Sequence, residues 1–204
     1  MKIFELFPTT VLVEQLVISK EEYEVISNIE TTRNELNNCH LSDNVSILEI
    51  QYLDSFKSKI LKYINKYFYE ILGITTNIIP VITNSWKIVH NKNDWAPIHR
   101  HTNCIVSGIY YLNVDKNSGN LVFYSGNKQS VQNNGVLDIP FNINNYNYTS
   151  WQIQPVNNML ILFPSFLEHS VKPSASEITR ISIAFDVFVK GELGNTPLNK
   201  FLLK

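Results

Sequence analysis

The sequence is poor in residues that mark several common classes of protein. Only two of its 204 residues are cysteines, Cys39 and Cys104, and they are far apart in the chain. This spacing suits a reducing interior better than a disulfide framework, so we expect a cytoplasmic protein.

Long apolar runs and a strong excess of one charge are also missing. No run of 18 apolar residues occurs, and Lys2 and Glu5 interrupt the N-terminus before a signal-peptide core could form. The formal net charge is −1 and the 17 basic residues are scattered, so there is no basic stripe to neutralise nucleic-acid phosphates. We therefore expect neither a membrane nor a nucleic acid among the partners.

The residues that are abundant favour a folded, mainly β protein. Hydrophobic residues make up 44% of the chain and aromatic residues 12%, which is enough apolar surface for a core of packed strands. A length of 204 residues fits one large all-β domain. We expect residues 1–204 to form a single domain.

The N-terminal third is expected to be helical after one extended segment. Residues 4–17 mix β-branched and aromatic residues around Pro8, which predicts an edge strand. A surface helix is predicted over 20–36 with Ser19 as its N-cap, and a stronger amphipathic helix from Asp54 to Gly73. These helices, within a helical part of about 18–73, should pack on one outer face of the β core.

From residue 77 onward the pattern changes to short β-rich runs separated by Asn, Gly, Pro and Ser, which is typical of a sandwich or barrel. The order of elements predicts an α+β fold that is mainly β. The predicted strands cover 78–90, 101–114, 120–125, 146–154, 159–163 and 179–189, with turns at 117–119, 133–135 and 157–158.

Four residues in the β-rich part are the most informative, and the three histidines among them suggest a metal site. His99 and His101 are two apart, so in a strand their side chains point to the same face, and a jelly roll can bring the distant His169 to them. Non-haem Fe(II) takes two or three histidines, or two histidines and a carboxylate, on one side of its coordination sphere. Arg180, one of only three arginines, has the planar fork that binds a carboxylate with two parallel hydrogen bonds.

Four motifs carry a resemblance to a known family. They are WAPIHRHTN (95–103), SGIYYL (107–112), FPSFLEHSV (163–171) and RISIAF (180–185), and the opening LFPTT (6–10) is also similar. In this order they resemble the small 2-oxoglutarate/Fe(II) oxygenases common in phage and marine bacteria, over nearly the whole chain. The resemblance implies a double-stranded β-helix (jelly-roll) core over about 77–190.

The resemblance also implies the cofactors and their ligands. Fe(II) would be held by His99, His101 and His169, and Arg180 would pair with the far carboxylate of 2-oxoglutarate, the co-substrate. Ser182 has the same strand parity as Arg180, and we expect it and Tyr110 beside the co-substrate. Further aromatic residues expected to keep water from the site are Tyr111, Phe123 and Trp86.

One departure leaves the ligand set open. The wider superfamily has a carboxylate two residues after the first histidine, where this chain has His101. Either His101 replaces the carboxylate, or only one of His99 and His101 coordinates and another group or water completes the site. Asp94, Asp115 and Asp186 are the available carboxylates, although Asp115 looks like a turn residue.

The implied reaction is oxidative decarboxylation of 2-oxoglutarate to succinate and CO2, with O2 consumed and hydrogen abstracted from a substrate that is then hydroxylated. The substrate, a small molecule or a peptide, is not readable, because specificity would lie in loops such as 127–145. The oligomeric state is equally open.

Two other functions compete with this interpretation. One is a three-histidine cupin-like dioxygenase without 2-oxoglutarate, and the other is a non-catalytic jelly-roll binding protein. For Arg180 itself, the alternative is a strand-end arginine that pairs with Glu177 or Glu168 at the surface.

Overall fold

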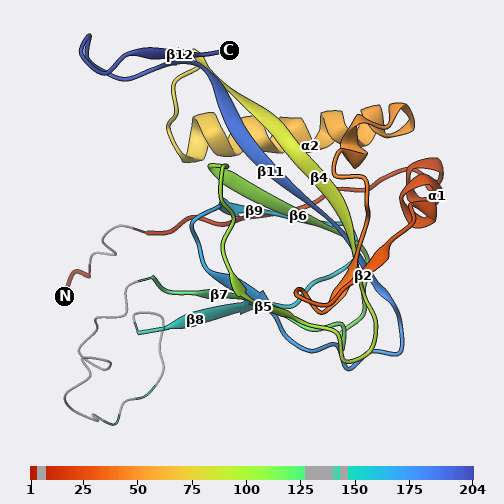
Figure 1. The fold of residues 1–204 in the computed structure, drawn as a ribbon. Helices are drawn as coiled ribbons and strands as arrows, with labels where there is room; N and C mark the ends of the chain where they lie inside the picture. The colour runs from red at the N-terminus through yellow and green to blue at the C-terminus, as the bar shows by residue number, and fades with distance from the viewer. Residues whose placement is uncertain (4–7, 127–139, 141, 143–146) are drawn as a thin grey trace.

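Two antiparallel sheets make up the β part of the protein in the computed structural model, which describes residues 1–3, 8–126, 140, 142 and 147–204 (Figure 1). The larger sheet has the strand order β1-β9-β6-β11-β4-β3-β2, and β12 pairs with β11 beyond this path. Its strands are β1 (Leu12–Gln15), β2 (Thr32–Asn34), β3 (Cys39–Leu41), β4 (Ile78–His90), β6 (Val106–Asn113), β9 (Met159–Pro164), β11 (Arg180–Leu193) and β12 (Phe201–Leu203).

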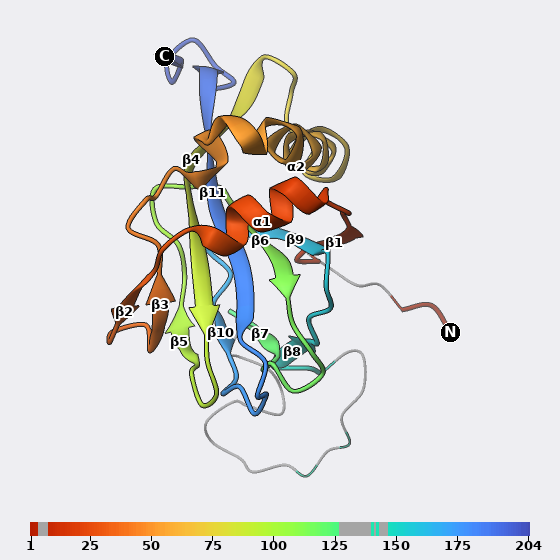
Figure 2. The same cartoon turned by 90° about the vertical axis from the view of Figure 1, so that its right-hand side faces the viewer.

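The smaller sheet has the order β5-β10-β7-β8 and lies on the side of the larger sheet away from the helices (Figures 1 and 2). It contains β5 (Ala96–His99), β7 (Leu121–Tyr124), β8 (Ser150–Ile153) and β10 (His169–Val171). Apolar side chains of both sheets, including Tyr111 and Phe163 from the larger and Phe123 and Val171 from the smaller, form one buried cluster.

The helices cover the opposite face of the larger sheet. Helices α1 (Lys20–Asn28) and α2 (Asp54–Lys66) lie across it (Figure 2). Between them run the short 3-10 turns η1 (Ile47–Glu49) and η2 (Gln51–Leu53), and η3 (Tyr67–Ile71) continues α2 as a π-helix. The prediction of a mainly β protein with helices on one outer face is confirmed.

The end of the second helix agrees with the prediction, but that of the first does not. Gly73 follows the helical segment with a φ of 67°, the left-handed conformation that terminates helices. Ser19 caps α1 as predicted, since its hydroxyl accepts a hydrogen bond from the Glu22 amide. However, α1 ends at Asn28 instead of continuing to 36, because no apolar helical repeat follows Ile29, and β2 and β3 form a hairpin there.

Several strand boundaries also differ from the predictions. The expected edge strand over 4–17 is limited to β1, and residues 4–7 lie outside the described residues. The expected strand over 101–114 begins only at Val106, and the separate short strand β5 precedes it. The expected turn at 133–135 and the start of the strand at 146 lie outside the described residues, whereas turns are present at 117–119 and 157–158.

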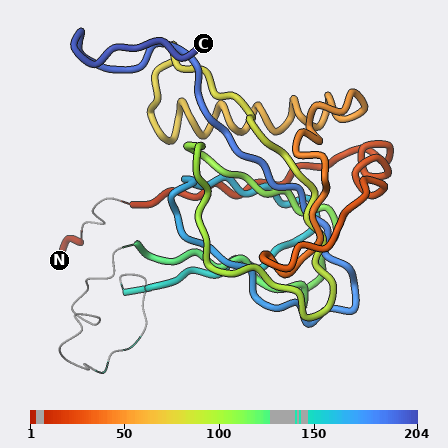
Figure 3. The backbone as a smooth tube through the Cα atoms, in the orientation of Figure 1, coloured from red at the N-terminus to blue at the C-terminus, as the bar shows by residue number. Residues whose placement is uncertain are grey.

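Strand β11 connects the helical layer to the space between the sheets. It pairs with β4 on one side and with β6 on the other, and Figure 3 shows its blue trace beside the yellow trace of β4. Alternate residues face opposite ways. Ile183 and Phe185 pack into the hydrophobic core between the helices and the larger sheet, which we call the helix-side core. Arg180, Ser182 and Asp186 line a pocket on the other face. A single strand thus carries both core and site.

Within the described ranges, no helix combines the length and the apolar character that a membrane span requires.

We predict that Phe56→Ala lowers the free energy of unfolding by about 3–5 kcal/mol, because Phe56 is fully buried. Its ring contacts Tyr110 edge-on, with ring centroids 4.9 Å apart. Denaturant unfolding measures the change. The matched control is Tyr52→Ala, since Tyr52 is 78% exposed, and this variant should stay within about 0.5 kcal/mol of the wild type. Equal effects of the two substitutions would contradict the helix-side core described here.

Candidate active site

Three histidines meet at one end of the space between the sheets. His99 ends β5 and His169 begins β10, and the two are direct partners in the antiparallel ladder. The ring centroids of His99 and His169 are 4.3 Å apart, those of His99 and His101 5.4 Å, and those of His101 and His169 5.2 Å. One nitrogen from each ring lies within 4.8 Å of the others, so the three rings can share one metal ion.

His101 reaches this cluster by a different route from the one predicted. We expected both histidines to lie in one strand, but β5 ends at His99 and His101 stands in the connection that follows. The amide of His101 donates to the Ser165 carbonyl at 3.1 Å, which ties this connection to the end of β9. His99 and His101 therefore face the same space because the backbone of His101 is hydrogen-bonded to Ser165, and not because the two residues alternate along one strand.

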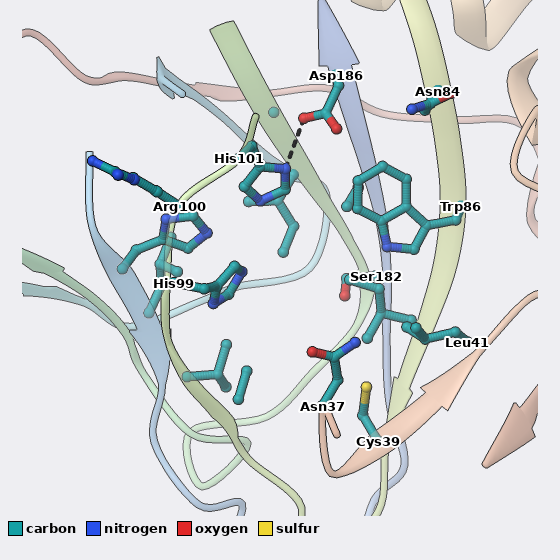
Figure 4. A pocket seen from close by; sticks show the side chains of 18 of the residues that line it. Asn37, Cys39, Leu41, Asn84, Trp86, His99, Arg100, His101, Ser182 and Asp186 are labelled. Carbon is teal, nitrogen blue, oxygen red and sulfur yellow. Dashed lines mark ion pairs between the residues drawn. The ribbon is translucent and has the colours of Figure 1, made fainter. Parts of the chain in front are cut away.

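Each imidazole has an oxygen next to its Nδ1 atom, through a hydrogen bond in His99 and His169 and through an ion-pair contact in His101. Nδ1 of His99 lies 2.8 Å from the Pro97 carbonyl, and Nδ1 of His169 lies 2.9 Å from the Leu167 carbonyl. Nδ1 of His101 lies 2.8 Å from a carboxylate oxygen of Asp186 (Figure 4). Because these oxygens only accept, all three rings carry their proton on Nδ1, and each Nε2 lone pair is free for a metal.

The protein around His169 keeps its imidazole neutral. Burial, and then the neighbouring His99, lower the pKa of His169 to about 3. The Phe163 ring packs edge-on against it with centroids 4.8 Å apart, and the Phe123 ring lies at 6.1 Å. A neutral imidazole is the form that binds metals, so the ring is ready to do so near neutral pH.

Arg180 is a fully buried cation that faces the same pocket. Its guanidinium donates to the carbonyls of Ser118 and Gly119 at 3.3 and 3.1 Å and to the Tyr111 hydroxyl at 3.4 Å. Within the described ranges it forms no ion pair with a carboxylate, and its Nε has no hydrogen-bond partner. Burial lowers the pKa of Arg180, but a guanidinium stays charged in proteins.

Two more polar side chains near Arg180 have unused hydrogen-bonding capacity. The Ser182 hydroxyl and both ring nitrogens of His90 are buried without a partner among the residues that the structure describes. His90 lies opposite Arg180 in the β4–β11 ladder, and both line the pocket. Burial, and then the charge of Arg180, lower the pKa of His90 to about 3, so His90 is a neutral group beside a cation.

Tyr110, which we expected at the co-substrate site, is placed elsewhere. Its ring packs on Phe56 in the helix-side core, and its hydroxyl donates to the Asn158 side chain at 2.8 Å. Tyr111 has the opposite strand parity and reaches Arg180 instead. Of the other aromatic residues predicted near the site, Trp86 stacks on His101 with centroids 5.9 Å apart.

The histidines and Arg180 line one cavity of about 440 Å³, which is within the range of small-molecule sites. Figure 4 shows His99, His101 and Ser182 pointing into this cavity from different segments of the chain. Exposed polar side chains stand among its lining residues, namely Asn37, Asn84, Arg100, Thr102 and Asn103. The predicted specificity loop over 127–145 lies almost entirely outside the described residues.

The remaining candidates from the sequence have other roles. Asp94 pairs with Arg33 at 2.7 Å, and Asp115 accepts hydrogen bonds within its own turn, as predicted. Cys104 lies near His101 and Asp186, but burial raises the pKa of its thiol and keeps it protonated. Neither cysteine forms a disulfide.

Sequence reasoning missed the roles of two residues. Asp186 was one of three candidate carboxylates with no position assigned, although its parity with Arg180 and Ser182 on β11 already placed it on the same face. His90 stood in none of the motifs, and only the pairing of β4 with β11 shows that it lies beside Arg180.

A family model described as "Putative 2OG-Fe(II) oxygenase" matches residues 84–186, which contain all three histidines and Arg180. The chain belongs to this family. No curated protein sequence matches it. As members of the family use Fe(II) and 2-oxoglutarate, this protein is an Fe(II)- and 2-oxoglutarate-dependent oxygenase that consumes O2 and acts on a substrate.

Solved structures show the same double-stranded β-helix fold. HygX from Streptomyces hygroscopicus, solved with nickel and 2-oxoglutarate bound, is 11% identical with a TM-score of 0.60, over 88% of this chain and 83% of that chain. A Pseudomonas putida prolyl-4-hydroxylase is 12% identical with a TM-score of 0.57, over 88% and 92%. A Trichoplax adhaerens prolyl hydroxylase in complex with a peptide fragment is 16% identical with a TM-score of 0.57, over 87% and 83%. The predicted jelly-roll core is confirmed.

We predict that His90 makes the metal-free protein less stable as the pH falls. The pKa of His90 is about 3 in the folded protein, so unfolding takes up a proton below the ordinary histidine value of about 6.5. The free energy of unfolding should therefore fall with decreasing pH, His90 contributing up to about 1.4 kcal/mol per pH unit. Denaturant titrations between about pH 5 and 6.5 should show a shallower slope for His90→Gln than for the wild type. Identical slopes would contradict this assignment.

Proposed function

We propose that His99, His101 and His169 bind Fe(II) through their Nε2 atoms, and that Arg180 and Ser182 bind the far carboxylate of 2-oxoglutarate. The bound Fe(II) and 2-oxoglutarate would support hydroxylation of a polar substrate. We also propose that residues 1–204 act as one oxygenase domain. The observation that carries the proposal is that every Nδ1 atom faces an oxygen, by a hydrogen bond to a carbonyl in His99 and His169 and by an ion-pair contact with Asp186 in His101, which leaves three Nε2 atoms for one metal ion.

The donor set fits Fe(II) in kind and number. Three imidazole nitrogens on one side of an ion leave the opposite positions open to other ligands. His169 is held neutral by burial, so binding does not require it to lose a proton near neutral pH. Fe(II) with bound 2-oxoglutarate supplies the activation of O2 and the oxidising power for attack on a C–H bond.

The anion end of the pocket fits a carboxylate for a separate reason. A buried guanidinium without a counterion is costly, and an incoming carboxylate offsets that cost while completing the hydrogen bonds of Arg180. Ser182 and His90 add two neutral groups that have no hydrogen-bond partner among the residues that the structure describes. His90 remains neutral near pH 7, so it can donate a hydrogen bond without adding a second positive charge.

Aromatic and polar residues in and next to the cavity orient the reactants and exclude water. Trp86, Phe123 and Phe163 place aromatic surface against the histidine rings, and a dry wall of this kind limits side reactions. The exposed lining carries amide groups and one guanidinium, at Asn37, Asn84 and Arg100. This chemistry favours a polar substrate, either a small molecule or a peptide.

The two competing functions have less support. A dioxygenase that does not use 2-oxoglutarate leaves no ligand for the charge of Arg180 inside the pocket. The alternative for Arg180, which would leave the pocket without a cation, was a pair with Glu177 or Glu168 at the surface. Instead Arg180 is fully buried, and Glu177 pairs with Lys92.

We predict that His169→Ala abolishes iron retention, because it removes the most buried of the three imidazoles. Iron content after anaerobic loading should fall at least about tenfold from one ion per chain. His40→Ala is the control, since His40 lies in β3 outside the group of three, and it should retain its iron. Stoichiometric iron in His169→Ala would reject the proposed ligand set.

We predict that Arg180→Ala weakens 2-oxoglutarate binding by about 30-fold or more, because truncating one partner of a buried charge pair typically costs at least about 2 kcal/mol. Succinate formation at a fixed 2-oxoglutarate concentration should fall with it, while iron content is unchanged. Arg180→Lys keeps the charge and loses the planar fork, so its affinity should lie between the two. Equal affinities in wild type and Arg180→Ala would exclude Arg180 as the anchor.

A further inference from the structure

One of the three histidines differs from the others in what holds it. His99 and His169 each bond through Nδ1 to the carbonyl of the residue two positions earlier in the chain. Nδ1 of His101 instead lies 2.8 Å from the carboxylate of Asp186, an ion-pair contact with a residue that lies on β11 and is remote in sequence (Figure 4). His99 and His169 therefore have neutral partners close in sequence, whereas His101 has a charged partner from the larger sheet.

The surroundings of Asp186 direct its charge to His101. Asp186 is 7% exposed and stands on the pocket face of β11. The Asp186 oxygen that forms the ion pair with His101 also accepts a hydrogen bond from the Ser107 hydroxyl at 2.8 Å. Among the described residues no lysine or arginine pairs with this carboxylate, and His101 is its ion-pair partner.

A carboxylate on Nδ1 changes what an imidazole offers at Nε2. It fixes the tautomer and ring orientation, and it makes the free nitrogen a stronger donor to a metal. Trp86 stacks on the same ring, so the ring plane is held from a second direction. His101 is thus the best oriented and the most electron-rich of the three candidate ligands.

The contact between His101 and Asp186 also places a negative charge near the proposed metal site, where the three histidine ligands themselves carry none. A set of two histidines and one carboxylate gives Fe(II) one negative charge, whereas three neutral imidazoles give none. Asp186 supplies one negative charge without contacting the metal, because the His101 ring lies between the carboxylate and the proposed metal position. Asp186 is grouped with His101 and Cys104, whereas the group of three imidazoles is His99, His101 and His169, so Asp186 stands behind His101 relative to the three-histidine site.

We infer that Asp186 is a positioning residue for the proposed iron site, which aims Nε2 of His101 at the metal and supplies the negative charge that a ligating carboxylate would otherwise provide. This inference rests on the proposed function, since it presumes that the three histidines hold the metal. It assigns Asp186 to the chemistry without placing it in contact with the iron or the substrate.

The test compares Asp186→Asn, which keeps the shape and an acceptor but removes the charge, with Asp186→Ala, which removes both. Anaerobic titration with Fe(II) and Co(II) should show metal affinity about 10-fold weaker for Asp186→Asn and about 100-fold weaker for Asp186→Ala. The visible absorption of the Co(II) protein reports the donor strength of its ligands and should shift in both variants. Far-UV circular dichroism confirms that each variant is folded.

Asp94→Asn is the matched control, because Asp94 is also 7% exposed but pairs with Arg33 away from the three histidines. Its metal affinity and Co(II) spectrum should equal those of the wild type. Ser107→Ala removes the other hydrogen bond to Asp186 while keeping the carboxylate, and it should retain most of the affinity. If Asp186→Ala does not fold, Asp186→Asn and Ser107→Ala still decide the question.

The outcomes separate this inference from the proposed function. Wild-type affinity and an unshifted spectrum in both Asp186 variants, with metal lost in His169→Ala, would overturn the role of Asp186 alone. Metal retained in His101→Ala but lost in Asp186→Ala would also overturn it, because Asp186 would then be a direct ligand. Metal retained in His169→Ala would instead reject the three-histidine site itself.

Discussion

The pairing of β11 with β4 and β6 is the constraint on which both the core and the site depend. Ile183, Phe185, Val187 and Val189 of β11 are buried in the core cluster beneath the helices, and that burial fixes which residues face the opposite way. A shift of this strand by one residue would turn Ile183 and Phe185 into the pocket and take Arg180 and Asp186 out of it. The apolar face of the strand therefore sets the position of its polar face.

That constraint explains which parts of the site were predictable from the sequence. Arg180 and Ser182 share a parity and were predicted together, and both line the pocket. Tyr110 and Tyr111 could not be distinguished in the same way, because β6 is buried on both faces and its sequence shows no alternation between apolar and polar residues. The choice of Tyr110 depended on which face meets the helices, and this is a property of the whole fold.

The fold itself was predictable where local signals were strong and less so where tertiary pairing decides. The capping serine and Gly73 mark helix ends by local chemistry, and both predictions agree with the structure. Strand β5 has only four residues and depends on β10 as its partner, so the sequence around His99 and His101 did not reveal where the strand stops. The carboxylate at Nδ1 of His101 comes from β11, which no local pattern around His101 indicates.

The way Arg180 is held has a consequence for how an anion enters. Its hydrogen-bond partners are two main-chain carbonyls and a phenol, all neutral. Such partners fix the direction of the guanidinium while leaving its charge uncompensated. The carboxylate of the proposed co-substrate would thus meet a guanidinium that is already oriented, and no ion pair with a described residue would have to break before it binds.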